Sequence, residues 1–434
     1  MKIHSSLRRV ALSVATVVMI CAYWPAHAGA QVRPGDTVTA DTATRVKNLV
    51  SPGVYLHVEQ GMTMKIVSTQ RVDWPPPYKD ATEKYSSQVS LTKDNRSVVG
   101  YVAGQPFPLI DPNDPLVAEK IVWNNVFRPI QSDDYDLRFF DCFAHYMTRG
   151  APDSLERDDT TVGHYAGYSE VGRTEVEPIP FDPDFKVTGR YWLFGVYPVI
   201  APASDRGDGL IRYRYADPNK GDDSWTYTPS ARRVRRLDES SLSIASGIAA
   251  WNPDHYSGFN PKTEAYNYKL LGEKDMLGVL HAEHSPEIPC ATDGQASQCP
   301  EAWEMRHMYV LEADPRYNVV NTTQGKTVIY MDSEAWFEPF VDVYDRRGQL
   351  FQNFMYFIAY RDRPVPDARV AIYPFKRLFV VGATSLECDS GLSNACYLPS
   401  PVAPERECWY INMGAVDRQF FSPNAMQEAA KNGR

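Results

Sequence analysis

The stretch Ser224–Leu237 reads SWTYTPSARRVRRL and decides what the surrounding chain must form. Trp225 and Tyr227 alternate with polar residues, as on a half-buried β-strand, and a Thr-Pro-Ser turn follows. Four arginines then flank one valine, Val234, and so many fixed charges do not fit inside a core. Strand alternation predicts two groups of side chains on opposite faces: Arg233 and Arg235 on one, and Arg232, Val234 and Arg236 on the other.

Further strand patterns surround this stretch and predict one large antiparallel sheet. Residues 210–215 alternate, and a polar loop at 217–222 returns the chain to Trp225. A second hairpin is predicted at 335–344 and 349–360, with large apolar side chains on both faces of its strands. A strand that is apolar on both faces is covered on both. Additional strands are expected at residues 64–68, 97–102, 186–199, 265–271, 305–312 and 327–332.

The N-terminal part of the chain is predicted to be helical, from about residue 38 to 130. Short helices are expected at 40–49, 54–59 and 80–89, and the apolar stripe of Val117, Ile121 and Val122 predicts the strongest helix at 116–127. Residues 133–176 are acidic and predicted to be irregular, with a solvated charged face.

The first residues have the pattern of an export signal. A basic start with Lys2, Arg8 and Arg9 precedes an apolar run and the sequence Ala26-His27-Ala28, so residues 1–28 are predicted to be a cleaved signal peptide. Its removal leaves 42 basic against 54 acidic residues, a net charge of −12. This acidic balance argues against nucleic-acid binding. The expected product is a single periplasmic domain, residues 31–434, with a cysteine-containing extension at about 385–434.

Six cysteines follow the predicted signal, and an even number in an exported chain favours disulfides. Six cysteines allow 15 pairings, and the sequence alone does not choose among them. Local closure favours Cys290 with Cys299 and Cys388 with Cys396, which leaves Cys142 with Cys408. A zinc site is the alternative, although no Cys-x-x-Cys spacing supports it.

Several long motifs resemble those of the proteobacterial DUF1329 family, over about residues 50–360. They are Ser51-Pro52-Gly53, Asp80-Ala81-Thr82-Glu83-Lys84-Tyr85, Tyr101-Val102-Ala103-Gly104, Asp111-Pro112-Asn113-Asp114-Pro115, Arg232-Arg233-Val234-Arg235-Arg236 and Tyr344-Asp345-Arg346-Arg347-Gly348-Gln349-Leu350. Members of that family are often described as similar to outer-membrane lipoprotein-sorting proteins, and the family resembles the LolA/LolB lipoprotein carriers.

This resemblance implies an α+β fold in which a large curved antiparallel sheet forms a half-open barrel with helices on its concave side. It also implies a place in envelope transport of lipids, lipoprotein acyl chains, steroid-like or other hydrophobic compounds. The partner would be an envelope transporter or an outer-membrane component, and no cofactor is expected. This chain is longer than such a carrier, and its cysteines are a departure from them.

Two groups of residues are candidates for binding. An apolar cavity is predicted to be lined by aromatic side chains, with ordinary core packing as the alternative for each: Trp225, Tyr227, Trp336, Phe354 and Tyr356. The four arginines of the opening stretch could bind an anionic head group or an acidic partner surface. Their alternative role is pairing with acids of neighbouring strands, such as Glu264, Glu312 or Asp332.

Catalytic interpretations are weaker. His281, Glu283 and His284 form the best metal-like cluster and would support a metal-assisted envelope hydrolase, but no second ligand group has a matching spacing. Asp332-Ser333-Glu334 lacks the G-x-S-x-G environment of a nucleophilic serine. We therefore expect a non-catalytic carrier, with the hydrolase and a structural adaptor without a ligand as alternatives.

Overall fold

The computed structural model describes residues 32–130, 132–146, 159–237, 253–256, 258–283, 301–317, 324–364, 371–397 and 409–432. The predicted signal peptide lies outside these residues, as do Cys290, Cys299 and Cys408. None of the helices in the described part of the chain combines the length and apolar character that a membrane-spanning helix needs.

One sheet dominates the described residues and contains 17 strands. They are β1 (Thr37–Val38), β2 (Met64–Ile66), β5 (Asp134–Tyr146), β6 (Asp159–Ser169), β7 (Arg190–Val196), β8 (Val199–Ala201), β9 (Gly209–Tyr215), β10 (Asp223–Thr228), β11 (Arg233–Leu237), β12 (Tyr266–Gly278), β13 (Glu301–Pro315), β14 (Gln324–Asp332), β15 (Phe340–Asp345), β16 (Leu350–Arg361), β17 (Arg377–Glu387), β18 (Leu392–Tyr397) and β19 (Trp409–Ile411). A separate two-strand sheet pairs β3 (Ser90–Leu91) with β4 (Val98–Val99).

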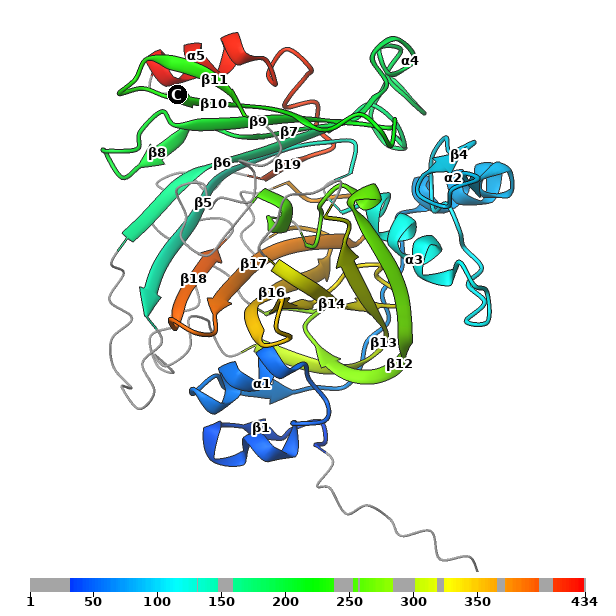
Figure 1. Cartoon of the computed structure of the whole chain (residues 1–434), viewed down its shortest axis with the longest axis vertical. Helices are drawn as coiled ribbons and strands as arrows, with labels where there is room; N and C mark the ends of the chain where they lie inside the picture. The colour runs from blue at the N-terminus through cyan, green and yellow to red at the C-terminus, as the bar shows by residue number, and fades with distance from the viewer. Residues whose placement is uncertain are drawn as a thin grey trace, which may run out of the picture. The chain divides into compact units, whose positions relative to one another are not determined.

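The strand pairings give an open sheet. From one edge the order is β11, β10, β9, β7, β6, β5, β18, β17, β16, β15, β14, β13 and β12. Strand β8 pairs with β6 on the same side as β7, and β19 pairs with β5 on the same side as β18. Only β2 joins its neighbour β13 in parallel. The sheet is curved and not closed into a barrel (Figure 1), which confirms the predicted α+β class with a large curved antiparallel sheet.

Three helices lie in the N-terminal part of the described chain, a short one lies between β6 and β7, and one lies near the C-terminal end. They are α1 (Pro52–Glu59), α2 (Pro76–Tyr85), α3 (Val117–Val126), α4 (Phe185–Thr188) and α5 (Pro423–Asn432). Ser51 begins α1, because its hydroxyl accepts from the Val54 N–H and Pro52 occupies the first turn. The prediction at 116–127 is confirmed by α3. The predicted helix at 40–49 is instead a 3-10 segment at Ala40–Arg45, and α2 begins four residues before the predicted start at Asp80.

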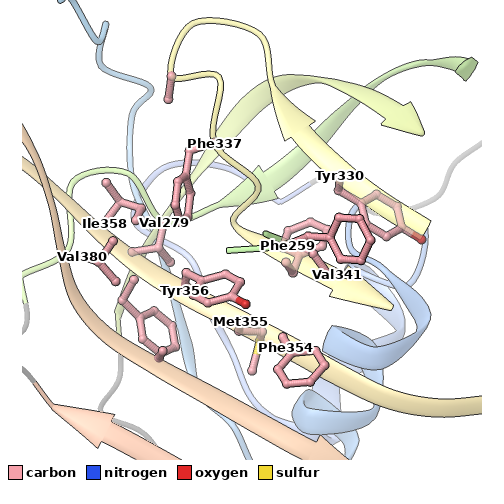
Figure 2. Packing of buried hydrophobic residues seen from close by; sticks show 14 of the residues in the cluster. Phe259, Val279, Tyr330, Phe337, Val341, Phe354, Met355, Tyr356, Ile358 and Val380 are labelled. Carbon is pink, nitrogen blue, oxygen red and sulfur yellow. The ribbon is translucent and has the colours of Figure 1, made fainter. Parts of the chain in front are cut away.

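The largest hydrophobic cluster joins the helices α1 and α3 to the second half of the sheet. Phe337, Phe354 and Tyr356 project into it and are almost completely buried (Figure 2). Strand β16 is buried at eight successive positions, Gln352 to Ala359. Protein therefore covers both faces of the predicted late hairpin, as its apolar residues on both faces indicated.

The first part of that hairpin differs from the prediction. Strand β15 begins at Phe340, not at Ala335, because residues 333–336 turn tightly around Asp332. The Asp332 carboxylate accepts from the backbone N–H groups of Glu334 and Ala335, and Trp336 adopts a φ of 47°. A side chain at such a φ cannot continue an extended strand.

The acidic region 133–176 was predicted to be irregular and solvated, and that prediction is wrong. It contains the long paired strands β5 and β6, and Asp133, Asp134 and Asp136 are buried. Asp133 accepts hydrogen bonds from the backbone N–H groups of residues 174–176. Burial raises the pKa of Asp133, while these bonds oppose that rise. Backbone N–H groups and arginines therefore contact these acids in place of the water that was predicted to solvate them.

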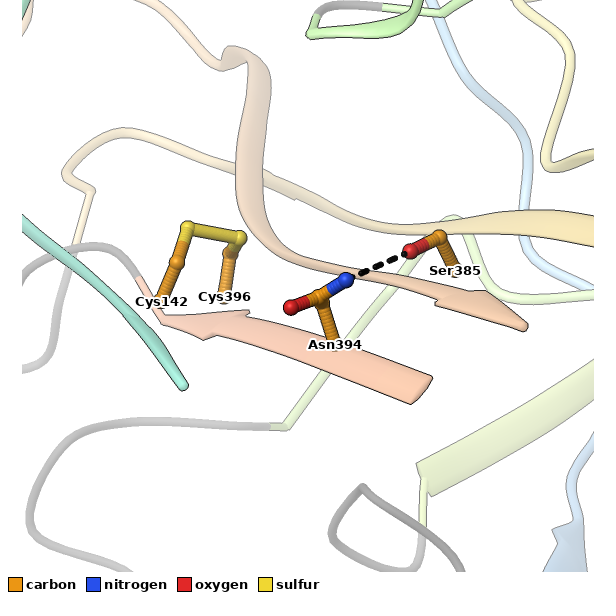
Figure 3. Close-up of a disulfide and its surroundings, with 4 residues drawn as sticks. All are labelled: Cys142, Ser385, Asn394 and Cys396. Atoms are coloured by element: carbon orange, nitrogen blue, oxygen red, sulfur yellow. Dashed lines mark hydrogen bonds between the residues drawn. A yellow bond between two sulfur atoms is a disulfide. The ribbon is translucent and has the colours of Figure 1, made fainter. Parts of the chain in front are cut away.

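The single disulfide among the described residues joins Cys142 of β5 to Cys396 of β18 (Figure 3). The two cysteines stand directly opposite each other in the antiparallel pair. Cys388 is free and half-buried. The predicted pairings of Cys388 with Cys396 and of Cys142 with Cys408 are therefore wrong, because strand pairing across the sheet overrides closeness in sequence. Beside the disulfide, the Asn394 amide donates to the Ser385 hydroxyl at 3.4 Å.

Candidate functional site

The arginine stretch forms the edge strand β11, and its register with β10 assigns its side chains to two faces. Thr226 and Thr228 stand opposite Arg235 and Arg233, whereas Trp225 stands opposite Arg236. Opposed residues of an antiparallel pair project to the same side of the sheet. Arg233 and Arg235 therefore share one face with the two threonines.

The other face of β10 lies under the C-terminal helix. Trp225 and Tyr227 pack with Ile211 of β9 and with Met426 of α5 in a separate small cluster. Helix α5 lies along β10 and β11 at one end of the sheet (Figure 1). It covers the face opposite to the one that carries Leu210, which belongs to the main cluster. The prediction placed helices only on the concave side of the sheet. Helix α5 thus packs on a face for which no helix was predicted.

A cavity of about 250 Å³ lies on the Leu210 face of these strands. Its lining combines apolar walls, small hydroxyl residues and two acids: Phe140, Thr161, Val196, Val199, Asp205, Asp208, Gly209, Leu210, Thr226, Tyr227, Thr228 and Tyr256. Val196, Leu210 and Thr226 stand opposite one another on β7, β9 and β10. Arg235 is the next member of this cross-strand row. The cavity wall therefore continues directly into the exposed arginine edge.

The charges at this edge are only partly paired. Arg236 pairs with Asp223, whereas Arg233 and Arg235 are exposed and have no ion pair within the described residues. The strand acids considered as their partners are engaged elsewhere, since Asp332 pairs with Arg306 at 2.7 Å and Glu312 with Lys326 at 2.8 Å. Two cationic side chains on the cavity face are thus available to an anion.

Asp205 and Asp208 give the cavity an acidic end. Burial raises the pKa of Asp208, and the neighbouring Asp205 raises it further. Asp208 lies next to the start of β9, two strands away from Arg233, which corresponds to about 10 Å of sheet width. The cavity is therefore apolar in the middle and charged at its rim.

A second cavity, of about 90 Å³, lies between α2, α3 and β7 and is largely closed by aromatic rings. Tyr101 stacks on Phe127 with ring centroids 3.8 Å apart, and Tyr191 approaches the same ring. Space of this size holds a few waters rather than an organic ligand.

Of the five aromatic residues predicted to line a cavity, only Tyr227 borders one of these two cavities. The other four line neither: Trp225, Trp336, Phe354 and Tyr356. Phe354 is stacked by His255 with centroids 3.9 Å apart, Trp336 by Tyr309, and Tyr356 meets the edge of Phe337. The structure therefore places Trp225 and Tyr227 under α5, with Tyr227 also bordering the larger cavity, and the other three aromatic candidates in the main core.

The candidate metal cluster is divided. The His281 Nδ1 lies 2.6 Å from the Glu304 carboxylate, and its ring packs edge-on against Tyr360. Glu283 is exposed, and His284 lies outside the described residues. Within the described residues no group of three or more histidine, cysteine or acidic side chains could hold a metal ion.

Asp332, Ser333 and Glu334 form a structural turn. Both acids accept from Arg306, which is buried, and Asp332 also caps the turn as described above. These contacts give Asp332 and Glu334 a structural role, because each is held by a buried arginine and by backbone N–H groups.

The sequence analysis missed Leu210, Thr226, Thr228 and Phe140 as cavity residues. The sequence pattern that could have indicated the cavity is the small or aliphatic residues that alternate with aromatic ones on β9 and β10. Large residues fill space, so a cavity lies where the alternating positions are small.

Comparison with known protein families gives a match over most of the chain. Residues 37–384 match the family described as "Protein of unknown function (DUF1329)". The chain is 20% identical over 352 residues to the uncharacterized protein PA3922 of Pseudomonas aeruginosa, covering 74% of this chain and 69% of that protein.

Two solved structures are similar at 15% identity. One is a putative outer membrane lipoprotein-sorting protein domain from Vibrio parahaemolyticus, with a TM-score of 0.45 over 71% of this chain and 98% of that one. The other is a DUF1329 family protein from Desulfovibrio piger, with a TM-score of 0.43 over 68% of this chain and 91% of that one. Because the family match spans most of the sequence, the chain belongs to the DUF1329 family.

Proposed function

We propose that this protein is a non-catalytic binding or carrier protein for a hydrophobic or amphipathic molecule in the cell envelope. The observation that carries the proposal is the cavity of about 250 Å³ whose wall continues into two unpaired arginines on the same sheet face. It has an apolar interior and a charged rim, which is the arrangement that an amphipathic ligand requires.

The size and lining of the cavity restrict the ligand. Small-molecule sites commonly measure roughly 300–1,000 Å³, so a cavity of about 250 Å³ suits a short or medium acyl chain, or one part of a larger lipid or steroid-like compound. Phe140, Val196 and Leu210 supply apolar contact, and the Thr226 hydroxyl adds a weak polar contact. Arg233 and Arg235 would attract an anionic ligand from solution.

The proposed location is the periplasm, with the outer membrane as a place of association. Two features support it: the predicted signal at residues 1–28, and a disulfide that fits an oxidising compartment. A partner would be an envelope transporter or outer-membrane component that delivers or receives the ligand.

The direct test is native mass spectrometry of the mature protein purified from membranes, followed by displacement of a fluorescent apolar probe. Thr226→Trp fills the cavity from its wall and should abolish probe binding. Ser230→Trp, in the exposed turn between β10 and β11, adds the same side chain outside the cavity and should bind normally.

Absence of any bound lipid together with equal probe binding by the two variants would refute a carrier role. If a complex with an envelope partner survives in Thr226→Trp, the protein is instead an adaptor that needs no ligand.

A further inference from the structure

A buried polar pair lies next to the cavity on the same sheet face. Arg212 of β9 stands opposite Ser224 of β10, and the following pair along the strands is Leu210 with Thr226, which lines the cavity. Residues two apart on a strand share a face and are separated by roughly 7 Å. Arg212 and Ser224 are therefore one step beyond the cavity wall, on the side away from Gly209.

Three polar atoms of this pair have no hydrogen-bond partner: Nε and Nη2 of Arg212 and Oγ of Ser224. Arg212 is only 1% exposed and Ser224 is completely buried, so bulk water does not solvate them. A buried donor without an acceptor lowers stability, and it does so more when it is charged, because its hydration is lost without replacement. Folded proteins rarely leave several such atoms together without a ligand or ordered water.

The neighbouring arginine shows what a satisfied guanidinium looks like in the same strand. Arg214 offers Nε and Nη2 to the Asp222 carboxylate, at 3.0 and 2.8 Å from Oδ2, and gives Nη1 to Asn260. Arg212 uses only Nη1, which donates to Asp254 Oδ1 at 2.5 Å. The edge that holds a carboxylate in Arg214 thus has no acceptor in Arg212 among the described residues.

We infer that Arg212 and Ser224 bind the carboxylate head group of the ligand whose apolar part occupies the adjacent cavity. Nε and Nη2 form one planar edge of the guanidinium, and two parallel N–H groups match the two oxygens of a carboxylate. The Ser224 hydroxyl donates to one of the same oxygens from the paired strand. The inference rests on the proposed carrier function and specifies its ligand as a carboxylic acid with a short or medium aliphatic chain.

The exposed arginines complete a route for such an acid. Arg235 stands beside Thr226, and Thr226 stands beside Leu210 in the same row. An anion attracted to the edge would move along a row of residues that leads toward the cavity and then to the buried Arg212. Its chain would remain against Val196 and Leu210, where removal from water is favourable.

The test compares decanoic acid with decanol for binding to the delipidated full-length mature protein. Both have the same chain, so their affinity ratio reports the head group. Wild type should prefer the acid by roughly ten- to a hundredfold at neutral pH, because a hydrogen-bonded charge is worth about 1.5–3 kcal/mol.

Ser224→Ala is the cleanest variant, because Oγ has no partner whose loss would destabilise the fold. It should leave thermal stability unchanged or slightly higher, keep decanol affinity, and weaken decanoic acid about tenfold. Arg212→Lys retains the charge beside Asp254 but removes the bidentate edge, and should weaken the acid further. Ser90→Ala, in the separate two-strand sheet, is the control that should change neither affinity.

The outcomes distinguish the two proposals. If neither compound binds, the carrier function itself fails. If both bind with equal affinity, and Ser224→Ala and Arg212→Lys leave their ratio unchanged, the carrier function stands and the carboxylate site is wrong.

Discussion

Aromatic residues in two regions of the sheet were predicted to line a cavity, but only one of these regions borders one in the structure. In the β15–β16 hairpin, Phe354 and Tyr356 lie in the main core and protein covers both faces. In the β9–β11 region, Trp225 and Tyr227 pack in the cluster under α5, although Tyr227 also borders the cavity, and Thr226 on the opposite face lines it.

The difference lies in the residues that alternate with the aromatic ones. Strand β16 carries large apolar groups at successive positions, so neither face leaves room. Strand β10 alternates aromatic residues with Ser224, Thr226 and Thr228, and β9 begins with a glycine. Aromatic richness therefore marks where the sheet is filled, and small side chains at alternate positions mark where a ligand could enter.

The largest expected effect contrasts the two regions directly. Phe354→Ala should lower the free energy of unfolding by about 3–5 kcal/mol, because a fully buried ring is replaced by a cavity. Thr226→Ala should cost less than about 1 kcal/mol, because its side chain already borders open space. Urea unfolding measures both changes, and similar losses for the two variants would contradict the distinction between filled and open regions.

The second effect concerns the junction between the two regions. The Cys142–Cys396 disulfide joins β5, on the cavity side, to β18, on the core side, across a sequence separation of 254 residues. Replacing both cysteines by serine should cost about 2–5 kcal/mol.

Cys388→Ser is the matched control. The Cys388 thiol is unpaired, and burial raises its pKa to about 12, so it should alkylate slowly in the native protein. Its replacement should cost less than the loss of the disulfide, as measured by thermal unfolding without reductant. A greater loss for Cys388→Ser than for the double variant would contradict the assigned pairing.

A pH effect of intermediate size is expected in the core region. Asp342 of β15 accepts from the Ser51 hydroxyl and the Gly53 N–H at the start of α1, and from the side-chain amide of Asn353 on the neighbouring strand β16. Burial raises its pKa from 3.8 to about 6, against the effect of these hydrogen bonds. The folded state therefore binds more protons than the unfolded state between roughly pH 4 and pH 6.

The protonated Asp342 carboxyl therefore stabilises the folded state below about pH 4. This contribution is lost as the pH rises through about 6, and the loss in unfolding free energy is at most about 3 kcal/mol. The difference in unfolding free energy between wild type and Asp342→Asn should change in that window and be constant outside it. A difference that is independent of pH would show that this carboxyl titrates normally.

Local patterns were sufficient to predict part of the fold. The alternation around Trp225, the turn after Tyr344 and the apolar stripe of α3 each depend on residues that are close in sequence. Such patterns report which face of an element is buried. They also assigned Arg233 and Arg235 to one face and Arg236 to the other, because alternation does not depend on what lies beyond the strand. The prediction for Arg232 is wrong, because this residue lies in the turn before β11 with a φ of 48°.

Features that depend on distant pairing could not be predicted. The acids of β5 look solvated in sequence, but Asp133 is satisfied by backbone N–H groups about forty residues later. The partner of Cys142 is set by the pairing of β18 with β5. The cavity and the open edge of Arg212 likewise result from the register of β7, β9 and β10, which no single segment determines.

The smallest expected effect on stability concerns the two arginines at the cavity edge. Replacing Arg233 and Arg235 together by glutamine should change the free energy of unfolding by less than about 0.5 kcal/mol for each residue, because both are exposed and without an ion pair in the described structure. The same double variant should slow association with decanoic acid at low salt, and the difference should shrink as ionic strength rises.

Arg232 and Arg236 provide the charge-matched control, because Arg236 lies on the opposite face of β11 and Arg232 lies in the turn before it, outside the strand. Stopped-flow measurement of the association rate over a range of salt concentrations distinguishes the two. A greater slowing in the Arg233 and Arg235 variant means that the cavity face guides the ligand. Equal slowing in both variants means that only net charge matters, and the arginines on the cavity face then have no special role in ligand entry.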